Sequence, residues 1–317
     1  MILLRTLDNL PDELRHGAVT IGNFDGVHRG HAALVETLVA EAKAHGGPTV
    51  VFTLDPHPAS VLRHERIPPS LSWTERKAEL LGHLGVDAMI AYPTDRHLLG
   101  LDARTFFQQI VRDRLAARAM VEGPNFFFGR DRSGDLDVLA HLCRQAHMVL
   151  KVAPAVEFEG ATISSSRIRR LVAEGAVEQA NRMLTQPYRI RGLVEHGRQR
   201  GRRLGIPTAN LGRIDTLVPG EGIYAARAWV GGAAWPAAVS VGPNPTFDES
   251  ALKIEAFLLG YEGDLYDRRI ELDFLARLRH IERFETADAL VAQVDRDIRE
   301  VQRIVAANQS EGKHDRR

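Results

Sequence analysis

From about residue 18 to 183, short apolar runs alternate with segments whose apolar residues recur at helical spacing. Five of the runs predict strands: AVTIGN, TVVFTL, VDAMIAY, RAMVEG and MVLKVAP. Between them lie helical patterns, the clearest over Leu34–Ala42. Strands that alternate with helices imply parallel βαβ units covered on both faces. We therefore expect an α/β fold, in which ligands bind beyond the carboxyl ends of the strands.

From about residue 188 the pattern changes to strand-like runs separated by glycine, proline and charged turns. The runs are YRIRGLVEH, GIYAARAWV, AWPAAVSVG, LKIEAFLLG and RRIELDFL. Regularly spaced short strands predict a small barrel or sandwich. One helix with an apolar face follows from Ala287 to Ile304, with Thr286 as its N-cap. We expect domains at 1–184 and 188–306, a linker near LTQPYR, and a disordered tail at 307–317.

Charge and composition argue against several classes of protein. The chain has 41 basic and 41 acidic residues, which does not fit a generally basic nucleic-acid binder. The one cysteine, Cys143, excludes an intrachain disulfide framework and a multi-cysteine metal site. No stretch approaches the roughly 20 apolar residues of a membrane span, and MILLRTLDNL does not fit a signal peptide. We expect a cytoplasmic protein that binds neither nucleic acid nor membrane.

The stretch GNFDGVHRGH, residues 22–31, lies at the end of the first expected strand. Its glycines let the backbone approach a ligand closely, and the N-terminus of the helix that follows favours an anion. His28 and His31 would share one face of the first helical turn. A metal site needs a third ligand, and no nearby Asp, Glu or Cys offers a familiar spacing. Phosphate binding is therefore favoured over a metal site and over purely structural histidines.

A second stretch, ISSSRIRRLV at 163–172, places three serines before an arginine-rich helix start. Serine hydroxyls and N–H groups can form an anion cradle, and an arginine can bind a phosphate through two hydrogen bonds. Alone, the stretch would fit a capped surface helix with solvated arginines. Together with the first motif, it favours a phosphate site.

GNFDGVHRGH and ISSSRIR together resemble the HxGH nucleotidyltransferase superfamily. Three more stretches narrow the resemblance: VVFTLDPHPASVL at 50–62, VEGPNFFFGRDRSGD at 121–135 and HGRQRGRRLGIPTANL at 196–211. The chain, except its tail, then resembles the bacterial bifunctional riboflavin kinase/FAD synthetases. This implies a Rossmann-like α/β nucleotidyltransferase domain, then a small antiparallel β-barrel kinase domain with a C-terminal helix. It also implies Mg²⁺ as cofactor and ATP, riboflavin and FMN as substrates.

In the first half, the resemblance implies transfer of AMP from ATP to FMN, giving FAD and pyrophosphate. Such a reaction needs no protein nucleophile because the phosphate of FMN attacks, so positioning and charge stabilisation suffice. His28 and His31 would bind the triphosphate, joined by Asn125 and Arg167. The other candidates for ATP binding are Gly22, Phe24, Asp25, Gly26, Gly30, Ser164, Ser165 and Ser166.

Two further groups in the first half have open interpretations. The flavin pocket could be lined by Pro56, His57 and Pro58, together with Phe24 and Asp25. The same five residues could instead only shape turns. We expect three consecutive phenylalanines to lie in the core and not to stack on a ligand ring: Phe126, Phe127 and Phe128.

In the second half, HGRQRGRRLGIPTANL could cradle phosphates with its glycines, although the residue order of a P-loop is absent. By resemblance, Thr208 and Asn210 meet the nucleotide phosphates and Mg²⁺, and both offer the hard oxygen ligands that Mg²⁺ prefers. A basic loop ending in a proline turn is the structural alternative. The other nucleotide-binding candidates are Gly197, Arg198, Gly201, Gly205 and Pro207.

Glu255 interrupts a strand of apolar residues. If the alternation turns its carboxylate to the inner face of the barrel, it is a candidate general base for the riboflavin hydroxyl. The catalytic glutamate of the family falls at this position. LARLRHIERF, with Arg279, resembles the flavin-side loop. Two residues of the second half depart from the family pattern: Ser240 stands where Asn is frequent, and Asp267 stands where glycine is common and would be strained at a positive φ. In the first half Ala32 stands where Gln is frequent.

Two other functions fit parts of the sequence. An adenylyltransferase with another acceptor, such as pantetheine phosphate, would account for the first half but is a single short domain. A flavin- or nucleotide-sensing module without turnover would have lost some of His28, His31, Thr208, Asn210 and Glu255, and all five are present. The sequence leaves the oligomeric state open.

Overall fold

The structure is a computed structural model, and it describes residues 1–58, 61, 68–197, 206–244 and 249–314. The chain forms two compact units. Unit 1 comprises Met1–Pro68 and Trp73–Ser164, and unit 2 comprises Pro69–Ser72 and Ser165–Arg317. No helix in the described part of the chain is long and apolar enough to cross a membrane.

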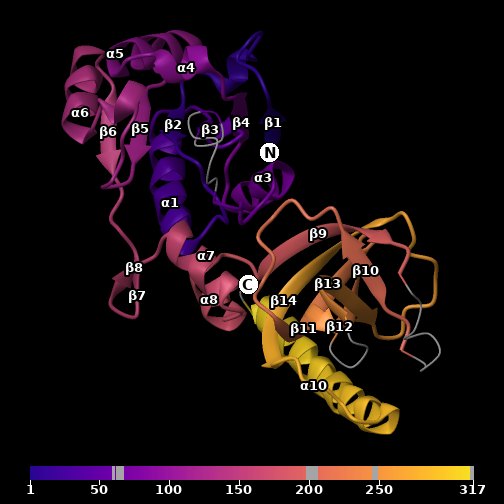
Figure 1. Ribbon diagram of the computed structural model, residues 1–317. Helices are drawn as coiled ribbons and strands as arrows, with labels where there is room; N and C mark the ends of the chain where they lie inside the picture. Colours follow the sequence, from indigo (N-terminus) through magenta and orange to yellow (C-terminus); the bar gives the residue numbers. More distant parts are fainter. Residues whose placement is uncertain (59–60, 62–67, 198–205, 245–248, 315–317) are drawn as a thin grey trace. The chain divides into compact units, whose positions relative to one another are not determined.

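Unit 1 is built on a sheet of six strands in the order β1-β4-β3-β2-β5-β6 (Figure 1). The strands are β1 (Ile2–Leu4), β2 (Ala18–Ile21), β3 (Thr49–Asp55), β4 (Ala88–Pro93), β5 (Ala119–Glu122) and β6 (Val149–Val152). All neighbours pair in parallel, which confirms the α/β prediction. Five strands match predicted runs, whereas β1 is too short to show a pattern. The chain changes direction of winding between β2 and β5, and this switch point is where such sheets bind ligands.

Helices cover both faces of this sheet. On one face α1 (Arg29–Ala44) and α3 (Thr74–His83) share a core around Leu38 and Leu81. The other face packs against α4 (Arg96–Gly100), α5 (Ala103–Phe106), a π-helical segment (Phe107–Arg114) and α6 (Leu136–Gln145). Three short elements complete the unit: two 3₁₀ turns (Asp12–Leu14 and Arg130–Arg132) and the hairpin of β7 (Glu157–Phe158) with β8 (Ala161–Thr162).

Unit 2 is a closed antiparallel barrel with the strand order β10-β13-β12-β11-β14-β9. Its strands are β9 (Tyr188–Glu195), β10 (Ala209–Gly212), β11 (Gly222–Val230), β12 (Ala233–Asn244), β13 (Glu249–Leu258) and β14 (Arg269–Arg279). Alternate residues fill the interior, among them Ile190, Tyr224, Leu272 and Phe274, all essentially unexposed. The barrel prediction is confirmed. Only β10, inside the PTAN stretch, was not predicted as a strand.

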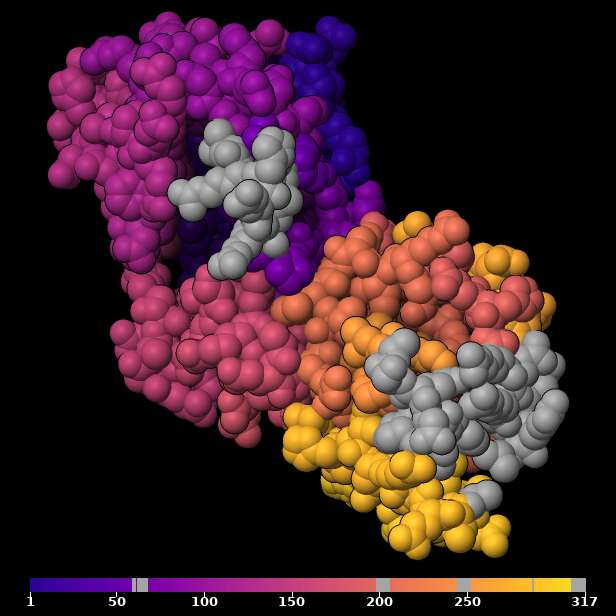
Figure 2. Space-filling view, viewed as in Figure 1, coloured from indigo at the N-terminus to yellow at the C-terminus, as the bar shows by residue number. Residues whose placement is uncertain are grey.

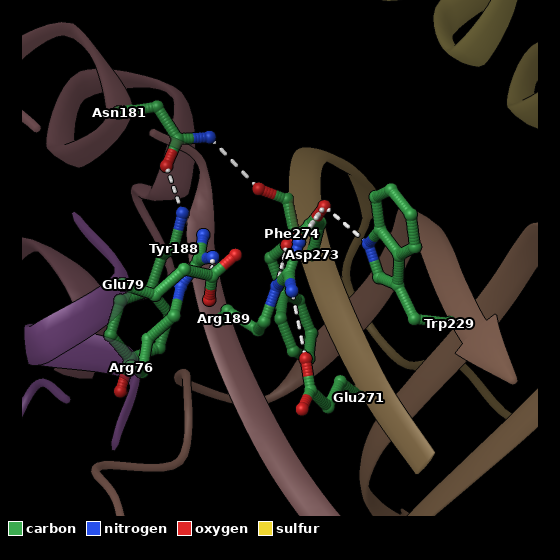
Figure 3. Close-up of polar contacts among 9 residues, drawn as sticks. All are labelled: Arg76, Glu79, Asn181, Tyr188, Arg189, Trp229, Glu271, Asp273 and Phe274. Carbon is green, nitrogen blue, oxygen red and sulfur yellow. Dashed lines mark hydrogen bonds and ion pairs between the residues drawn. The ribbon is translucent and has the colours of Figure 1, made fainter. Parts of the chain in front are cut away.

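Two helices precede the barrel and belong to the same unit: α7 (Ser165–Ala173) and α8 (Val177–Met183). The amide of Asn181 in α8 donates to the carbonyl of Phe274 in β14 and accepts from the N–H of Tyr188 in β9, both at 2.8 Å (Figure 3). The packing units therefore divide at Ser164, whereas the sequence suggested a boundary at 184–188.

The last helix, α10 (Ala287–His314), lies on the outside of the barrel (Figure 2). The Thr286 hydroxyl accepts from the N–H of Ala289 at 3.2 Å, as expected for an N-cap. Val301 and Val305 pack on Ala225 and Leu275 of the barrel. The helix continues to His314, through residues expected to be disordered, because extending an existing helix needs no new nucleus.

An ion-pair cluster on the outer side joins β9, β11 and β14 (Figure 3). Arg189 donates to Asp273 at 2.5 Å and to Glu271 at 2.7 Å, and the indole of Trp229 donates to Asp273 at 2.8 Å. Asp273 is buried, so these donors are needed to offset the desolvation of its carboxylate.

Candidate active sites

The loop after β2 turns sharply before it enters α1. Phe24 and Val27 have φ angles of 48° and 39°, which residues other than glycine rarely adopt. Both side chains are buried in the core that α1 shares with the sheet, so packing holds this strained backbone. At Gly30, a Cβ atom would lie only 3.1 Å from the ring of His28. The loop is therefore a rigid support for the two histidines.

His28 and His31 hold each other in place at the N-terminus of α1. Their rings stack with centroids 3.6 Å apart. The N–H of His31 donates to Nδ1 of His28 at 3.2 Å, and the N–H of His28 donates to Nδ1 of His31 at 3.3 Å. Since each Nδ1 accepts a hydrogen bond, a neutral ring carries its proton on Nε2. Each histidine thus has an Nε2–H that can donate to a ligand.

Burial keeps both rings neutral. It lowers the pKa of His28 to about 4, against the opposing effect of Asp25. It also lowers the pKa of His31 well below its usual value, and the nearby His28 and Lys77 add to the effect. At neutral pH the pair therefore offers hydrogen-bond donors and no positive charge. Positioned neutral donors suit phosphate oxygens on which charge shifts during a reaction.

The two rings line a cavity of about 280 Å³ at the switch point between β2 and β5. Gly22 and Phe24 line it from the loop after β2, Gly30 from the first turn of α1, and Asn125 from the loop after β5. The structure thus brings together predicted ATP-binding residues from two strand ends. Part of the remaining wall is largely apolar and was not predicted, since its residues carry no chemical signal: Ala153–Val156, Thr162 and Ile163.

The other residues predicted for this site lie outside the cavity lining. Asp25 is buried within the loop, and Gly26 has a φ of 79°. Ser164 is the last residue of unit 1, whereas Ser165, Ser166 and Arg167 begin α7 in unit 2. Their cooperation with His28 stays a prediction.

The expected flavin residues follow β3 directly. Nε2 of His57 lies 2.9 Å from the side-chain amide of Asn23, in the loop after β2. The hydroxyl of Thr94, after β4, donates to the carbonyl of Pro56 at 2.5 Å, and Pro58 is the last residue described before the gap at 59–60. The contact of His57 with Asn23 connects the flavin candidates to the loop of the histidine pair.

One of the three phenylalanines expected in the core is not there. Phe128 is buried and Phe126 packs against the same core, but Phe127 is 46% exposed. The prediction is wrong for Phe127 because consecutive side chains of an extended segment point to opposite sides. Its ring lies under the guanidinium of Arg132 instead, at 4.4 Å.

Glu122, the last residue of β5, also lines this cavity and was not predicted. Its side chain is 1% exposed, and it accepts from the N–H of Ile21 at 2.8 Å and from the hydroxyl of Thr20 at 3.4 Å. It therefore joins β5 to β2 where the two strands diverge. Burial raises the pKa of this carboxyl well above its usual value, although the two hydrogen bonds oppose the shift.

Replacing Glu122 with Gln should stabilise the protein at pH 8 and have little effect near pH 4. The folded state holds the Glu122 proton above the pH at which the unfolded chain releases it, so wild-type stability falls as the pH rises through the folded pKa. Gln does not titrate and avoids this loss. Denaturant unfolding across the pH range would measure the difference, with Glu36→Gln at an exposed position of α1 as the control. A gain that did not grow with pH would contradict this account.

In unit 2 a row of paired residues crosses four strands. Asn210 of β10 pairs with Glu195 of β9 and with Glu255 of β13, and Glu255 pairs with Ser240 of β12. Directly opposed residues have Cβ atoms roughly 5 Å apart. Asn210 therefore lies between two glutamates on one face of the barrel wall.

This face is the outer one. The interior positions of β13 are the buried Ile254, Ala256 and Leu258, which alternate with Glu255. Glu255 therefore does not face the barrel interior, although the sequence analysis required this of a candidate general base. It is half-buried on the outer face beside Asn210, so the two proposed kinase residues still share one surface.

The glycine-rich stretch is described only in part. A Cβ atom at Gly197 would lie 2.3 Å from the amide nitrogen of Asn210, so only glycine fits over this side chain. Pro207 is exposed and Thr208 is half-buried just before β10. Three of the predicted residues lie outside the described residues: Arg198, Gly201 and Gly205.

A second cavity, of about 560 Å³, is lined by Pro207, Thr208 and interior barrel residues. Residues from the loop after β13 complete the lining: Tyr261, Gly263, Asp264, Leu265 and Tyr266. Its size suits a small-molecule substrate. These loop residues were not predicted, although their run of aromatic and acidic residues was visible. The cavity lining does not include Asn210 or Glu255.

Two other residues singled out in the sequence have clear structural roles. Asp267 has a φ of 58°, so it does adopt the conformation for which glycine is common, and its N–H donates to the carbonyl of Val194. Arg279 donates through Nε and Nη2 to Asp297 of α10, the closest contact being 2.9 Å. Its Nη1 donates to the carbonyl of His280 and to Glu282. This arginine anchors α10 to β14, and its contact with flavin stays a prediction.

Comparison with known proteins agrees with both halves. Residues 10–167 match the family model described as FAD synthetase, and residues 184–305 match the one described as riboflavin kinase. A bifunctional riboflavin kinase/FMN adenylyltransferase of Pseudomonas fluorescens is 36% identical over 299 residues, which cover 94% of this chain and 96% of that protein. The chain belongs to this family. The enzyme of the same name from Escherichia coli K12 is 32% identical over the same shares.

Membership of the bifunctional riboflavin kinase/FMN adenylyltransferase family confirms the resemblance drawn from the motifs. The match covers both halves, so the alternative of a single-domain adenylyltransferase is excluded. A crystal structure described as a macrolide-efflux protein from Streptococcus pneumoniae is 28% identical, with a TM-score of 0.85 over 95% of this chain and 98% of that one. The complete two-unit chain therefore has a solved structural counterpart.

Proposed function

We propose that this chain phosphorylates riboflavin to FMN in unit 2 and adenylylates FMN to FAD at the histidine pair of unit 1. The observation that supports this most directly is that each of the two family matches falls on a unit with a cavity lined by residues of the matching motif. Both reactions consume ATP, and we place the enzyme in the cytoplasm. We include neither nucleic acid nor membrane among its partners.

In the first unit, an oxygen of the FMN phosphate attacks the α-phosphorus of ATP, and the bond to the pyrophosphate oxygen breaks. No protein nucleophile is needed, because FMN brings its own anionic oxygen. The Nε2–H groups of His28 and His31 donate to the triphosphate and stabilise the charge that moves to the leaving pyrophosphate. Asn125 lines the same cavity. The motif alone suggests Ser164–Ser166 and Arg167 as further phosphate-binding residues.

In the second unit, the 5′-hydroxyl of riboflavin attacks the γ-phosphorus of ATP and ADP leaves. Glu255 is proposed to accept the hydroxyl proton. The donor set around it fits Mg²⁺, because Thr208 and Asn210 offer neutral hard oxygens and Glu255 pairs with Asn210 on the same face. We propose that Mg²⁺ would neutralise phosphate charge in both reactions, and that Thr208 and Asn210 would hold it in the second unit.

Incubation of the purified protein with riboflavin, ATP and Mg²⁺ tests the proposal. We expect FMN to form first and FAD to follow, with release of ADP and then of pyrophosphate. Chromatography of the flavins over time would separate the two steps. Formation of FMN without FAD would exclude the adenylyltransferase half, and the absence of any flavin phosphate would exclude both halves.

A further inference from the structure

Lys77 lies in α3, on the face of this helix that carries Thr74 and Leu81. Thr74, three residues earlier, donates through its hydroxyl to Asp55 at the end of β3, at 2.7 Å. Leu81, four residues later, is fully buried in the core that also contains Phe24 and Val27. Residues three and four apart share one face of a helix, so Lys77 projects between these two anchors. The helix therefore directs an ammonium group toward the loop of the histidine pair.

The surroundings of this ammonium are charged but give it no direct partner. It interacts electrostatically with the carboxylates of Asp25 and Asp55 and with the ring of His31. In the described part of the chain, no hydrogen bond or ion pair joins it to another residue. Burial lowers the pKa of Lys77, although the two carboxylates oppose the shift. An anion bound beside Lys77 would restore the stability of its charged form.

We propose, resting on the function proposed above, that Lys77 binds the phosphate group of FMN as it approaches ATP. A half-buried lysine is a compact point charge on a flexible stem and suits a phosphate that has to move toward its target. The ammonium offsets the repulsion between the FMN phosphate and the polyphosphate of ATP.

The neighbours of Lys77 favour the FMN phosphate over the triphosphate. One neighbour is His31, which belongs to the pair assigned to ATP. Another is Asp55, directly before the residues assigned to the flavin, Pro56–Pro58. The phosphate of FMN has to lie between its own flavin ring and the α-phosphate of ATP, which corresponds to this position. FMN and ATP both carry phosphate groups that a lysine can bind, so the experiment must distinguish the effect on FMN from the effect on ATP.

The KM values for FMN and for ATP, measured from steady-state FAD formation in a Lys77→Met variant, show which of the two substrates Lys77 binds. Met keeps the length and apolar stem but removes the charge. We expect the KM for FMN to rise roughly 10- to 100-fold, as for the loss of a hydrogen bond to a charged group, while the KM for ATP stays close to wild type. Lys77→Arg should restore most of the affinity for FMN. Lys43→Met, at an exposed position near the end of α1, is the matched control and should behave as wild type.

A rise in the KM for ATP alone would overturn the proposal, as would unchanged constants for both substrates. An equal loss with both substrates that Lys77→Arg does not restore would show a structural role and also overturn it. If Lys77→Met fails to fold, Lys77→Gln, which keeps a polar side chain, carries the same comparison. Wild-type protein that forms no FAD from FMN and ATP would instead refute the function proposed for unit 1.

Discussion

Replacing His28 with Ala should abolish FAD formation from FMN while leaving the phosphorylation of riboflavin nearly intact. The change removes the Nε2–H of His28, and loss of one such donor costs about 10²- to 10³-fold in rate. It also removes the ring that stacks on His31 and the Nδ1 acceptor that holds the His31 N–H. Both donors are therefore disturbed by one substitution. Assays started with FMN and with riboflavin, each with ATP, would measure the two activities separately.

A His28→Asn variant separates chemistry from helix capping. Asn is a favourable N-cap residue, and its side-chain oxygen can accept the His31 N–H in place of Nδ1. With Oδ1 in the position of Nδ1, its Nδ2–H₂ group is too short to reach the position of the Nε2–H donor. We expect stability close to wild type and a loss of FAD formation close to that of His28→Ala. Retained activity in His28→Asn would mean that His28 only caps the helix, and loss of both activities in a folded variant would contradict two separate sites.

For the histidine pair of unit 1, the sequence predicted the position of the two residues but not their hydrogen bonds or their charge state. Spacing and the strand end predicted that His28 and His31 would share the first turn of a helix, and the structure places them there. Their reciprocal hydrogen bonds and neutral state could not be predicted, since both depend on burial by residues distant in sequence. Glu122 was missed for the same reason: a carboxylate after an apolar run carries no signal until β2 lies beside it.

The outward position of Glu255 could not be predicted because both faces of β13 carry apolar residues. Ile254 and Ala256 fill the barrel, while Leu259 on the following turn packs with α10 on the outside. Alternation with a period of two then gives no indication of which face is inside. The helix α10 covers part of the outer wall. It comes from a segment at the end of the chain, so the sequence of β13 alone does not show that its outer face is partly covered. β10 was missed because it has only four residues and begins within the loop-like PTAN stretch.

Replacing Glu255 with Ala or Gln should abolish FMN formation and leave FMN-to-FAD conversion nearly intact. Neither side chain can accept the proton of the riboflavin hydroxyl, and loss of a general base costs about 10²- to 10⁴-fold. Gln keeps the size and the hydrogen-bonding capacity of the side chain, so the barrel wall should be preserved. ADP release with riboflavin as substrate would measure the kinase, and pyrophosphate release with FMN would measure the second step.

The row across the barrel supplies a matched control, because Glu195 pairs with Asn210 from the opposite side. Its carboxylate lies near Arg213, at 3.8 Å, and a Cβ atom at Gly212 would meet it at 2.4 Å, so it leans away from Asn210 along the strand. Glu195→Gln should therefore retain most of the kinase activity. If Glu195→Gln lost FMN formation and Glu255→Gln kept it, the base would be Glu195. If both variants stayed active, neither glutamate on this face would be the base.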